Sequence, residues 1–310
     1  MRKIYVLVLT VALVLTLLAG CGGESAAPEV TPTPETAATP EPPSTAPDPT
    51  PVPTPEPTEV PTPEPKGEKN RMYELLTGVF DNYHAGVAGS SLTAAWYAAS
   101  IVDWTAKNGT EAAEEGALAW DRGTETEFGE SFREKLTLMY STALALTGPY
   151  RGILSDCGFE GDWDYDARSV HAAFETVFDA LDLETPVMLL VWYPNDDASA
   201  LNAAAMEVVD LSTKTIGDAL TDYAGIVAGA IEDQNWEGGE LHVALSRDFW
   251  QQVCAQGTAG EYMLLGSLVN TLLDAYRTDR VILTVDGAVP ETGHNIYDYP
   301  LERYDYDPGD

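Results

Sequence analysis

The sequence predicts an α+β protein, an N-terminal helical bundle followed by a mixed α/β domain, and three observations lead to this fold class. Residues 70–182 carry apolar side chains at three- and four-residue steps, the spacing of an amphipathic helix. After Thr185-Pro186 the apolar side chains fall in short β-branched and aromatic runs between turn residues, which is typical of strands. A proline-rich segment without such runs precedes both parts. We place the two folded domains at residues 67–184 and 185–310.

Residues 1–20 predict a signal peptide of the lipoprotein type. Arg2 and Lys3 precede an apolar run at positions 4–17, and Leu-Ala-Gly-Cys follows at once. The run is short for a helix that must cross about 30 Å of hydrocarbon, so export and cleavage are favoured over a membrane span. Small residues directly before a cysteine resemble the lipobox of bacterial lipoproteins, which implies that Cys21 becomes the mature N-terminus and carries lipid such as palmitate. We expect an extracytoplasmic protein, lipid-anchored to the cell membrane; an uncleaved anchor or an ordinary signal peptide is the alternative.

Residues 21–66 begin with the lipidated cysteine and continue as a predicted disordered linker. Their proline, threonine, glutamate and alanine include almost no large apolar side chain, so burial cannot offset the entropy lost on ordering the backbone. At about 3.1 Å per residue in polyproline II conformation, the segment spans roughly 140 Å. We expect a stalk that holds the folded part away from the membrane; recognition of its Pro-x-Pro repeats by a partner is the alternative.

The charge of the chain indicates which partners its surface favours. With 50 acidic and 16 basic residues, the formal net charge is −34. Such a surface repels the phosphates of nucleic acid and of anionic lipid head groups, so we expect no nucleic-acid partner, and contact with the membrane only through the lipid anchor. Cations and basic protein surfaces are the better candidate partners, while solubility alone is the plain explanation of the charge.

Two further cysteines and one acidic segment bear on disulfides and metals. Cys157 and Cys254 fall in different predicted domains, so the sequence leaves open whether they pair. No Cys-x-x-Cys or His/Cys cluster with metal spacing is present. The segment "DWDYD" at residues 162–166 is similar to the start of a calcium loop, but Ala167 stands where such a loop needs glycine. We therefore expect an acidic N-terminal cap for a helix that begins at Ala167, and predict no metal site and no cofactor.

Five apolar stripes predict the helices of the bundle. Ser90 or Ser91 suits the N-cap of the second helix, and Gly148-Pro149 ends the fourth. The predicted helices lie at about residues 73–80, 90–104, 111–120, 128–144 and 167–181.

The second domain is predicted to form a β-sheet with helices packed on one face. The run "VMLLVWY" is typical of a buried strand and stops at Pro194. Leu241, Val243 and Leu245 alternate with His242, which places this histidine on the less buried face of its strand. We expect strands at residues 187–194, 206–211, 230–236, 240–245 and 280–287, and helices at residues 215–223 and 257–276.

Five elements of this second domain resemble a known family. "LSRDF", "GEYMLLGSLVNTLLD", "DRVILTVDG", "ETGH" and "PLER" follow one another between Leu245 and Tyr304 in the order and spacing of the GerMN domain of bacterial sporulation and germination lipoproteins. The resemblance covers about residues 187–304, is strongest over residues 245–304, and is poor over residues 195–239. It implies a mixed α/β module of the cell envelope without established catalysis, involved in assembly and in association with peptidoglycan.

The same stretch supplies the candidate site residues. Asn270 lies on the flank of an apolar helical stripe, where an amide is unfavourable unless it finds partners, so we expect it to bond a neighbouring strand or loop. Asp286 and Gly287 form the turn after the last strand, and Gly293 and His294 lie in a loop that turns the chain back over the sheet. A histidine there either hydrogen-bonds the backbone or titrates in catalysis.

The leading functional hypothesis is a non-enzymatic cell-envelope lipoprotein with a GerMN-like binding or assembly module, acting in sporulation, germination or cell-wall processes. Its candidate partners are envelope proteins and peptidoglycan. No catalytic residue is assigned, because the motifs GxSxG, HExxH and SxxK with a downstream KTG are absent from the sequence. Abundant carboxylates leave an acid/base pair open, so the alternative is a peptidoglycan hydrolase that uses His294 and a carboxylate. A solute-binding lipoprotein is a third hypothesis, but one α+β domain with a bundle lacks the usual two-lobed cleft.

Overall fold

The computed structural model describes residues 69–84, 91–124 and 130–305. The predicted signal peptide, Cys21 and the proline-rich linker lie outside these residues and stay predictions. None of the helices in the described ranges combines the length and hydropathy needed to cross a membrane.

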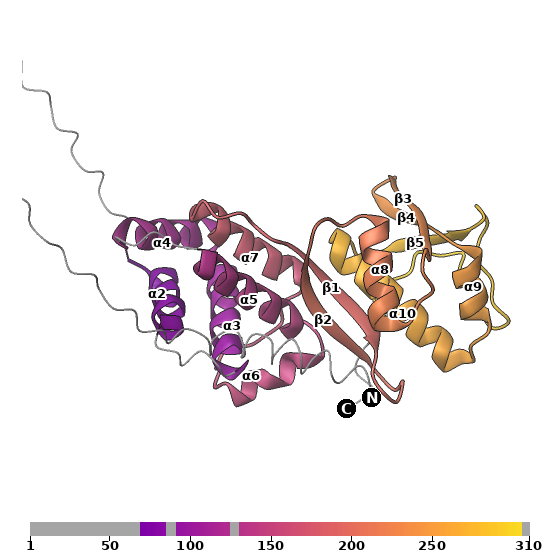
Figure 1. Cartoon of the computed structure of the whole chain (residues 1–310), viewed down its shortest axis with the longest axis horizontal. Helices are drawn as coiled ribbons and strands as arrows, with labels where there is room; N and C mark the ends of the chain where they lie inside the picture. Colours follow the sequence, from indigo (N-terminus) through magenta and orange to yellow (C-terminus); the bar gives the residue numbers. More distant parts are fainter. Residues whose placement is uncertain (1–68, 85–90, 125–129, 306–310) are drawn as a thin grey trace, which may run out of the picture. The chain divides into compact units, whose positions relative to one another are not determined.

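The first part of the described chain is helical, as the apolar stripes predict (Figure 1). Of the two predicted caps, Ser90 falls outside the described residues, and Ser91 is the first residue of the helix and not the cap before it. Asp166 caps the last of these helices through its carboxylate, which accepts a hydrogen bond from the backbone N–H of Ser169, so the predicted acidic cap is confirmed. The helices are α2 (Arg71–His84), α3 (Ser91–Asn108), α4 (Thr110–Gly123), α5 (Glu130–Leu146), the 3₁₀ turn η1 (Pro149–Gly152), the short α6 (Ile153–Asp156) and α7 (Ala167–Ala180).

The remainder of the chain alternates strands with helices (Figure 1). Most predicted elements are confirmed, including the hairpin, in which His242 lies half-buried between buried Leu241 and Val243. Helix α9 was not predicted; Ser246 caps it by accepting from the N–H of Phe249. The elements are β1 (Val187–Pro194), β2 (Leu201–Val208), α8 (Thr213–Ala224), β3 (Ile231–Glu237), β4 (Glu240–Leu245), α9 (Arg247–Cys254), α10 (Thr258–Tyr276) and β5 (Val281–Val285).

The second strand was predicted at residues 206–211, but it begins and ends earlier in the structure. Strand β2 starts at Leu201 and ends at Val208. Its alanines have low strand propensity, but Ala203 lies directly opposite the large ring of Trp192 in the antiparallel register with β1. Pairing a small residue with a large one fills the space between the strands, so packing outweighs local propensity.

Within the described residues the strands form two sheets, not the single sheet that the sequence predicts. Strands β1 and β2 pair antiparallel by themselves. In the second sheet, of order β3-β4-β5, β3 and β4 are antiparallel while β4 and β5 are parallel. The helices α9 and α10 separate β4 from β5 in the sequence, which provides the length that a parallel connection requires.

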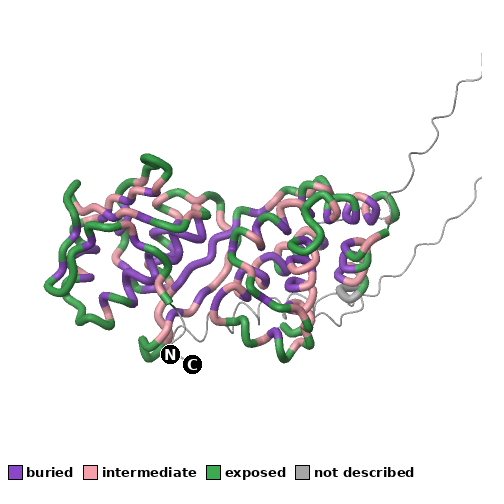
Figure 2. The backbone as a smooth tube through the Cα atoms, turned by 180° about the vertical axis from the view of Figure 1, so that it is seen from behind, coloured by how far each residue is buried: buried purple, intermediate pink, exposed green. Residues whose placement is uncertain are grey.

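Strand β1 is buried on both faces, which corrects the expectation of helices on one face only (Figure 2). Leu189 and Val191 belong to a core formed with α8, α10 and the second sheet. Met188, Leu190 and Trp192 belong to the core of the helical part. Because successive side chains of a strand point to opposite faces, the continuous apolar run supplies both cores.

The predicted boundary between residues 184 and 185 is crossed by packing and by ion pairs. The described residues on both sides of it belong to one compact unit. Arg133 of α5 lies 2.7 Å from Glu207 of β2, and Arg277, just after α10, forms a two-pronged ion pair with Glu175 of α7. The helical and α/β parts therefore share side-chain contacts on several elements.

Neither of the two described cysteines is in a disulfide. Cys157 is half-buried and Cys254 is exposed, and both are free thiols. The disulfide that the sequence left open is not formed in this structure.

Candidate functional site

Asn270 joins α10 to the C-terminal segment. Its side chain is fully buried, its Nδ2 donates to the carbonyl oxygen of Tyr304 at 2.8 Å, and its Oδ1 accepts from the N–H of Tyr304 at 2.8 Å. Gly266 lies one turn earlier, and a Cβ there would come within 3.2 Å of the Cβ of Tyr304. The expected bond from Asn270 to a neighbouring segment is confirmed, and it holds the closing residues of the chain against the helix.

Asp286 and Gly287 form a tight turn after β5. Their φ angles are 50° and 73°, and Val285 and Ala288 exchange two backbone hydrogen bonds of 3.0 Å around them. Positive φ at both central positions is the mark of a type I′ hairpin turn, for which Asp-Gly is a favoured pair. The carboxylate of Asp286 also accepts from Nε of Arg247 at 3.0 Å, so this predicted turn is confirmed and is tied to the start of α9.

Gly293 and His294 lie at the tip of a short two-stranded ribbon, residues 289–298, which we call the ETGH ribbon. The N–H of Tyr297 donates to the carbonyl oxygen of Pro290 at 3.0 Å, and the N–H of Thr292 donates to the carbonyl oxygen of Asn295 at 2.9 Å. A Cβ at Gly293 would meet no atom within 4 Å, so its space does not require glycine. The side chain of His294 is exposed, while its backbone N–H donates to Oγ1 of Thr292 at 3.2 Å.

A buried carboxylate that the sequence reasoning missed holds this ribbon. Glu261, in the first turn of α10, is only 2% exposed. Its Oε1 accepts hydrogen bonds from Oγ1 of Thr292 at 3.0 Å, from Nδ2 of Asn295 at 3.1 Å and from the hydroxyl of Tyr297. Its second oxygen, Oε2, is buried without a hydrogen-bond partner among the described residues. We call Glu261 with these three partners the Glu261 clasp.

The clasp keeps its carboxylate ionised. Burial raises the pKa of Glu261, but the three hydrogen bonds and the nearby His294 outweigh burial, so the pKa lies below its usual value. The positive end of the α10 dipole acts in the same direction. Burial and the bond to this carboxylate together raise the pKa of the Tyr297 phenol. A glutamate that directly precedes the apolar stretch of this helix was the sequence signal for the clasp, but its partners lie some thirty residues further along the chain.

The clasp bears directly on the hydrolase alternative. A glycosidase-type acid must protonate its substrate, which requires an accessible carboxyl with a raised pKa. Glu261 has a lowered pKa, is only 2% exposed, and commits its Oε1 to three donors of the ribbon. Within the described ranges, no group of three or more His, Cys, Asp or Glu side chains is arranged to hold a metal ion.

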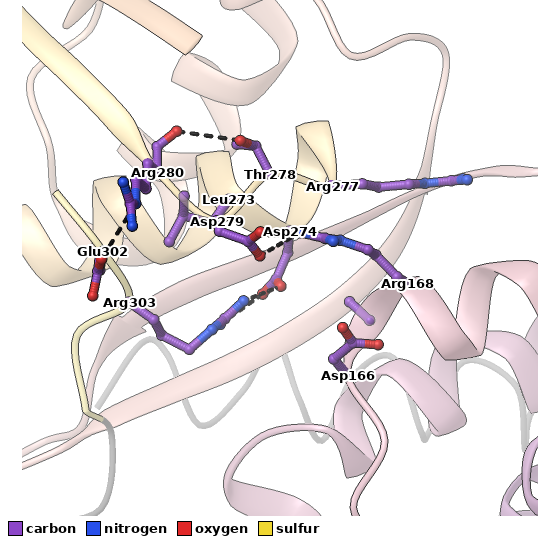
Figure 3. Close-up of a pocket in the computed structure, with 11 residues that line it drawn as sticks. Asp166, Arg168, Leu273, Asp274, Arg277, Thr278, Asp279, Arg280, Glu302 and Arg303 are labelled. Atoms are coloured by element: carbon purple, nitrogen blue, oxygen red, sulfur yellow. Dashed lines mark hydrogen bonds and ion pairs between the residues drawn. The ribbon is translucent and has the colours of Figure 1, made fainter. Parts of the chain in front are cut away.

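A second candidate site is a polar cleft of about 400 Å³, which we call the arginine cleft (Figure 3). It lies where the start of α7, the end of α10 and the C-terminal segment meet. Sequence reasoning did not find it, because Arg168 comes from α7 and the other arginines of the cleft lie more than a hundred residues later. Its lining residues are Asp166, Ala167, Arg168, Leu273, Asp274, Arg277, Thr278, Asp279, Arg280, Glu302 and Arg303.

One wall of the cleft is fixed by a network around the buried carboxylate of Asp274. Asp274 accepts a hydrogen bond from Nε1 of Trp192 at 2.7 Å and a two-pronged pair from Arg303, one of whose bonds is 3.1 Å long. The guanidinium of Arg303 also lies 5.6 Å from the centre of the Trp192 ring. The N–H of Trp192 donates to Oγ1 of Thr271 at 2.9 Å, so this network ties β1, α10 and the C-terminal segment together.

The rim of the cleft carries two exposed ion pairs (Figure 3). Arg168 pairs with Asp279, and the two side chains are 46% and 81% exposed. Nε of Arg280 lies 3.3 Å from Glu302, with exposures of 56% and 68%. Arg277 extends away from this group toward Glu175. Exposed pairs of this kind contribute about 0–1 kcal/mol each, so Arg168 and Arg280 are the cations that a ligand can engage.

Comparisons with known proteins found no matching family model, no matching curated protein and no matching solved structure. The functional argument therefore rests on the Glu261 clasp, the ETGH ribbon and the arginine cleft.

Proposed function

We propose that this chain is a lipid-anchored protein of the cell envelope whose α/β part is a GerMN-like module for binding or assembly, without catalysis of its own. In this proposal a signal peptide, a lipidated Cys21 and a disordered stalk precede a helical bundle, and residues 185–310 form the module. The resemblance over residues 187–304 supplies the envelope setting, including a role in sporulation, germination or cell-wall processes.

The observation that carries the proposal is the structural use of the polar residues in the GerMN-like pattern. Asn270 holds the C-terminal segment, Asp286 closes a turn, and Glu261 holds the ETGH ribbon. Side chains committed to such bonds make a rigid scaffold, which suits a module that presents a surface.

The ETGH ribbon supplies such a surface. Pro290 and Tyr297 face inward and are buried, whereas Val289 and Ile296, on the outer face, are 54% and 55% exposed. The outer face also carries exposed acidic side chains, as at Glu291. A protein partner with an apolar centre and basic surroundings complements this face in shape and charge.

A binding assay with the full-length chain in detergent tests the proposal. We expect the chain to retain purified peptidoglycan or solubilised envelope proteins. The substitution Ile296→Asp should weaken binding to the envelope proteins at least tenfold. Val209→Asp is the matched control, because Val209 is 93% exposed and lies outside the ribbon. A chain that retains neither peptidoglycan nor envelope proteins contradicts the proposal.

Incubation with purified peptidoglycan separates this proposal from the hydrolase alternative. We expect no release of soluble fragments by the full-length chain or by His294→Ala. Release of soluble fragments by the wild type but not by His294→Ala contradicts the proposal of a non-catalytic protein.

A further inference from the structure

The arginine cleft is balanced in charge, unlike the rest of the molecule. The whole chain has 50 acidic and 16 basic residues, but four arginines and four carboxylates line the cleft. A surface selected only for solubility does not gather a quarter of the chain's cations in one hollow. The members of this set are Arg168, Arg277, Arg280 and Arg303 with Asp166, Asp274, Asp279 and Glu302.

Seven of the eight groups divide into a fixed set and an exchangeable set, while the eighth, Asp166, is committed to the cap of α7. Arg303 and Asp274 are committed to each other and to Trp192, and Arg277 is committed to Glu175. The exposed pairs Arg168–Asp279 and Arg280–Glu302 remain at the rim. Because each exposed pair is weak, an incoming charged group can replace either partner at little cost.

The exchangeable groups select a ligand that carries both charges. A purely anionic ligand that took Arg168 and Arg280 would leave the carboxylates of Asp279 and Glu302 facing it, in a molecule already strongly negative. A purely cationic ligand would leave both guanidinium groups unpaired. A ligand with a carboxylate and an ammonium group can replace one partner in each of the two pairs, which keeps the charge of the rim balanced, and the planar fork of arginine binds such a carboxylate in two-pronged geometry.

We propose that the arginine cleft binds the zwitterionic end of a short peptide, with the peptide carboxylate on the arginine of one rim pair and a peptide ammonium group on the carboxylate of the other rim pair. A volume of about 400 Å³ fits the end of such a peptide and lies in the usual range for small-ligand sites. The proposal rests on the envelope role above, because the stem peptides of peptidoglycan present a free carboxylate together with an amine.

Calorimetric titration of the full-length chain with the tripeptide L-Lys-D-Ala-D-Ala tests the cleft. We expect binding, and a loss of at least tenfold in affinity when the peptide carboxylate is amidated or when its amines are acetylated. Arg168→Ala combined with Arg280→Ala should produce a similar loss without changing the melting temperature, because both arginines are exposed. Arg247→Ala is the matched control, since Arg247 forms an exposed pair with Asp286 outside the cleft.

Two outcomes overturn the proposal: no binding at millimolar peptide, or binding that the double substitution leaves unchanged. Retention of peptidoglycan or of envelope proteins by the double variant, in the assay described above, distinguishes failure of the cleft from failure of the envelope role. A wild-type chain that retains either material but does not bind the tripeptide contradicts only the proposal for the cleft.

Discussion

At the scale of single residues, Glu261 decides the conformation of a segment that begins nearly thirty residues later. One carboxylate oxygen accepts hydrogen bonds from Thr292, Asn295 and Tyr297, and all three donors belong to the ETGH ribbon. The ribbon is short and has few backbone pairs of its own. Its shape is therefore held by this buried acceptor together with the hydrogen bond from Nε1 of Trp250 to the carbonyl oxygen of Glu291.

Replacing Glu261 by alanine should cost about 2–3 kcal/mol, because it leaves buried donors without an acceptor. We expect urea unfolding to show this loss, and hydrogen exchange to show lower protection at the amides of Thr292 and Tyr297. Glu291→Ala, an exposed change on the same ribbon, should stay within about 0.5 kcal/mol. Equal effects of the two substitutions would remove Glu261 from its assigned role.

Asn270 makes a similar prediction for the C-terminal segment. Asn270→Ala removes both bonds to the backbone of Tyr304, and we expect a loss of about 2 kcal/mol together with faster proteolysis near that residue. Asn235→Ala, an exposed change in β3, serves as the control. A tail that resists proteolysis equally in both variants would show that other contacts hold it.

At the scale of elements, the sequence predicted those whose pattern is local. Helices such as α7 repeat apolar residues along one face and were found with their caps. Helix α9 is only eight residues long, and its pattern is too short to stand out. The start of β2 depends on Ala203 fitting against Trp192, a contact that only the pairing of two strands creates.

The candidate sites were harder to predict than the elements. The sequence marked Asn270 and the Asp286-Gly287 turn, because an amide within a helix and an Asp-Gly pair are local signals. The clasp and the arginine cleft join segments far apart in the chain, such as Arg168 and Asp279. No periodicity or motif in the sequence indicates such a contact, because the two segments come together only when the chain folds.

Strand β1 carries the next prediction, since its alternate side chains enter two cores. Leu189→Ala and Leu190→Ala remove buried side chains from different cores, and each should cost about 2–5 kcal/mol. We expect one unfolding transition in both variants, seen together by tryptophan fluorescence and by far-ultraviolet circular dichroism. Val187→Ala, at the exposed end of the strand, is the control. Two separate transitions would show that the cores unfold independently.

At the scale of the whole molecule, the helical and α/β parts are joined near a buried histidine. His171 of α7 lies beside the hydroxyl of Tyr140, to which its Nδ1 is hydrogen-bonded, while Glu175 one turn later pairs with Arg277. Burial, followed by the charge of Arg277, lowers the pKa of His171 to about 4, against the opposing effect of Asp166. The histidine is therefore neutral in the folded protein at neutral pH.

This lowered pKa makes stability depend on pH in a defined direction. Between pH 6.5 and 4 the unfolded chain binds a proton at His171 that the folded chain does not, so stability falls as the pH falls through this window. A difference of this size corresponds to about 3 kcal/mol, of which roughly 2 kcal/mol is lost between pH 6.5 and 5. The large negative charge of the molecule opposes the trend, because protonation of surface carboxylates relieves self-repulsion.

Urea unfolding of the wild type and of His171→Gln at several pH values separates the two effects. We expect the free energy of unfolding of the wild type to approach that of His171→Gln as the pH falls to 5. A difference that stays constant with pH would show that the pKa of His171 is the same in the folded and unfolded chain.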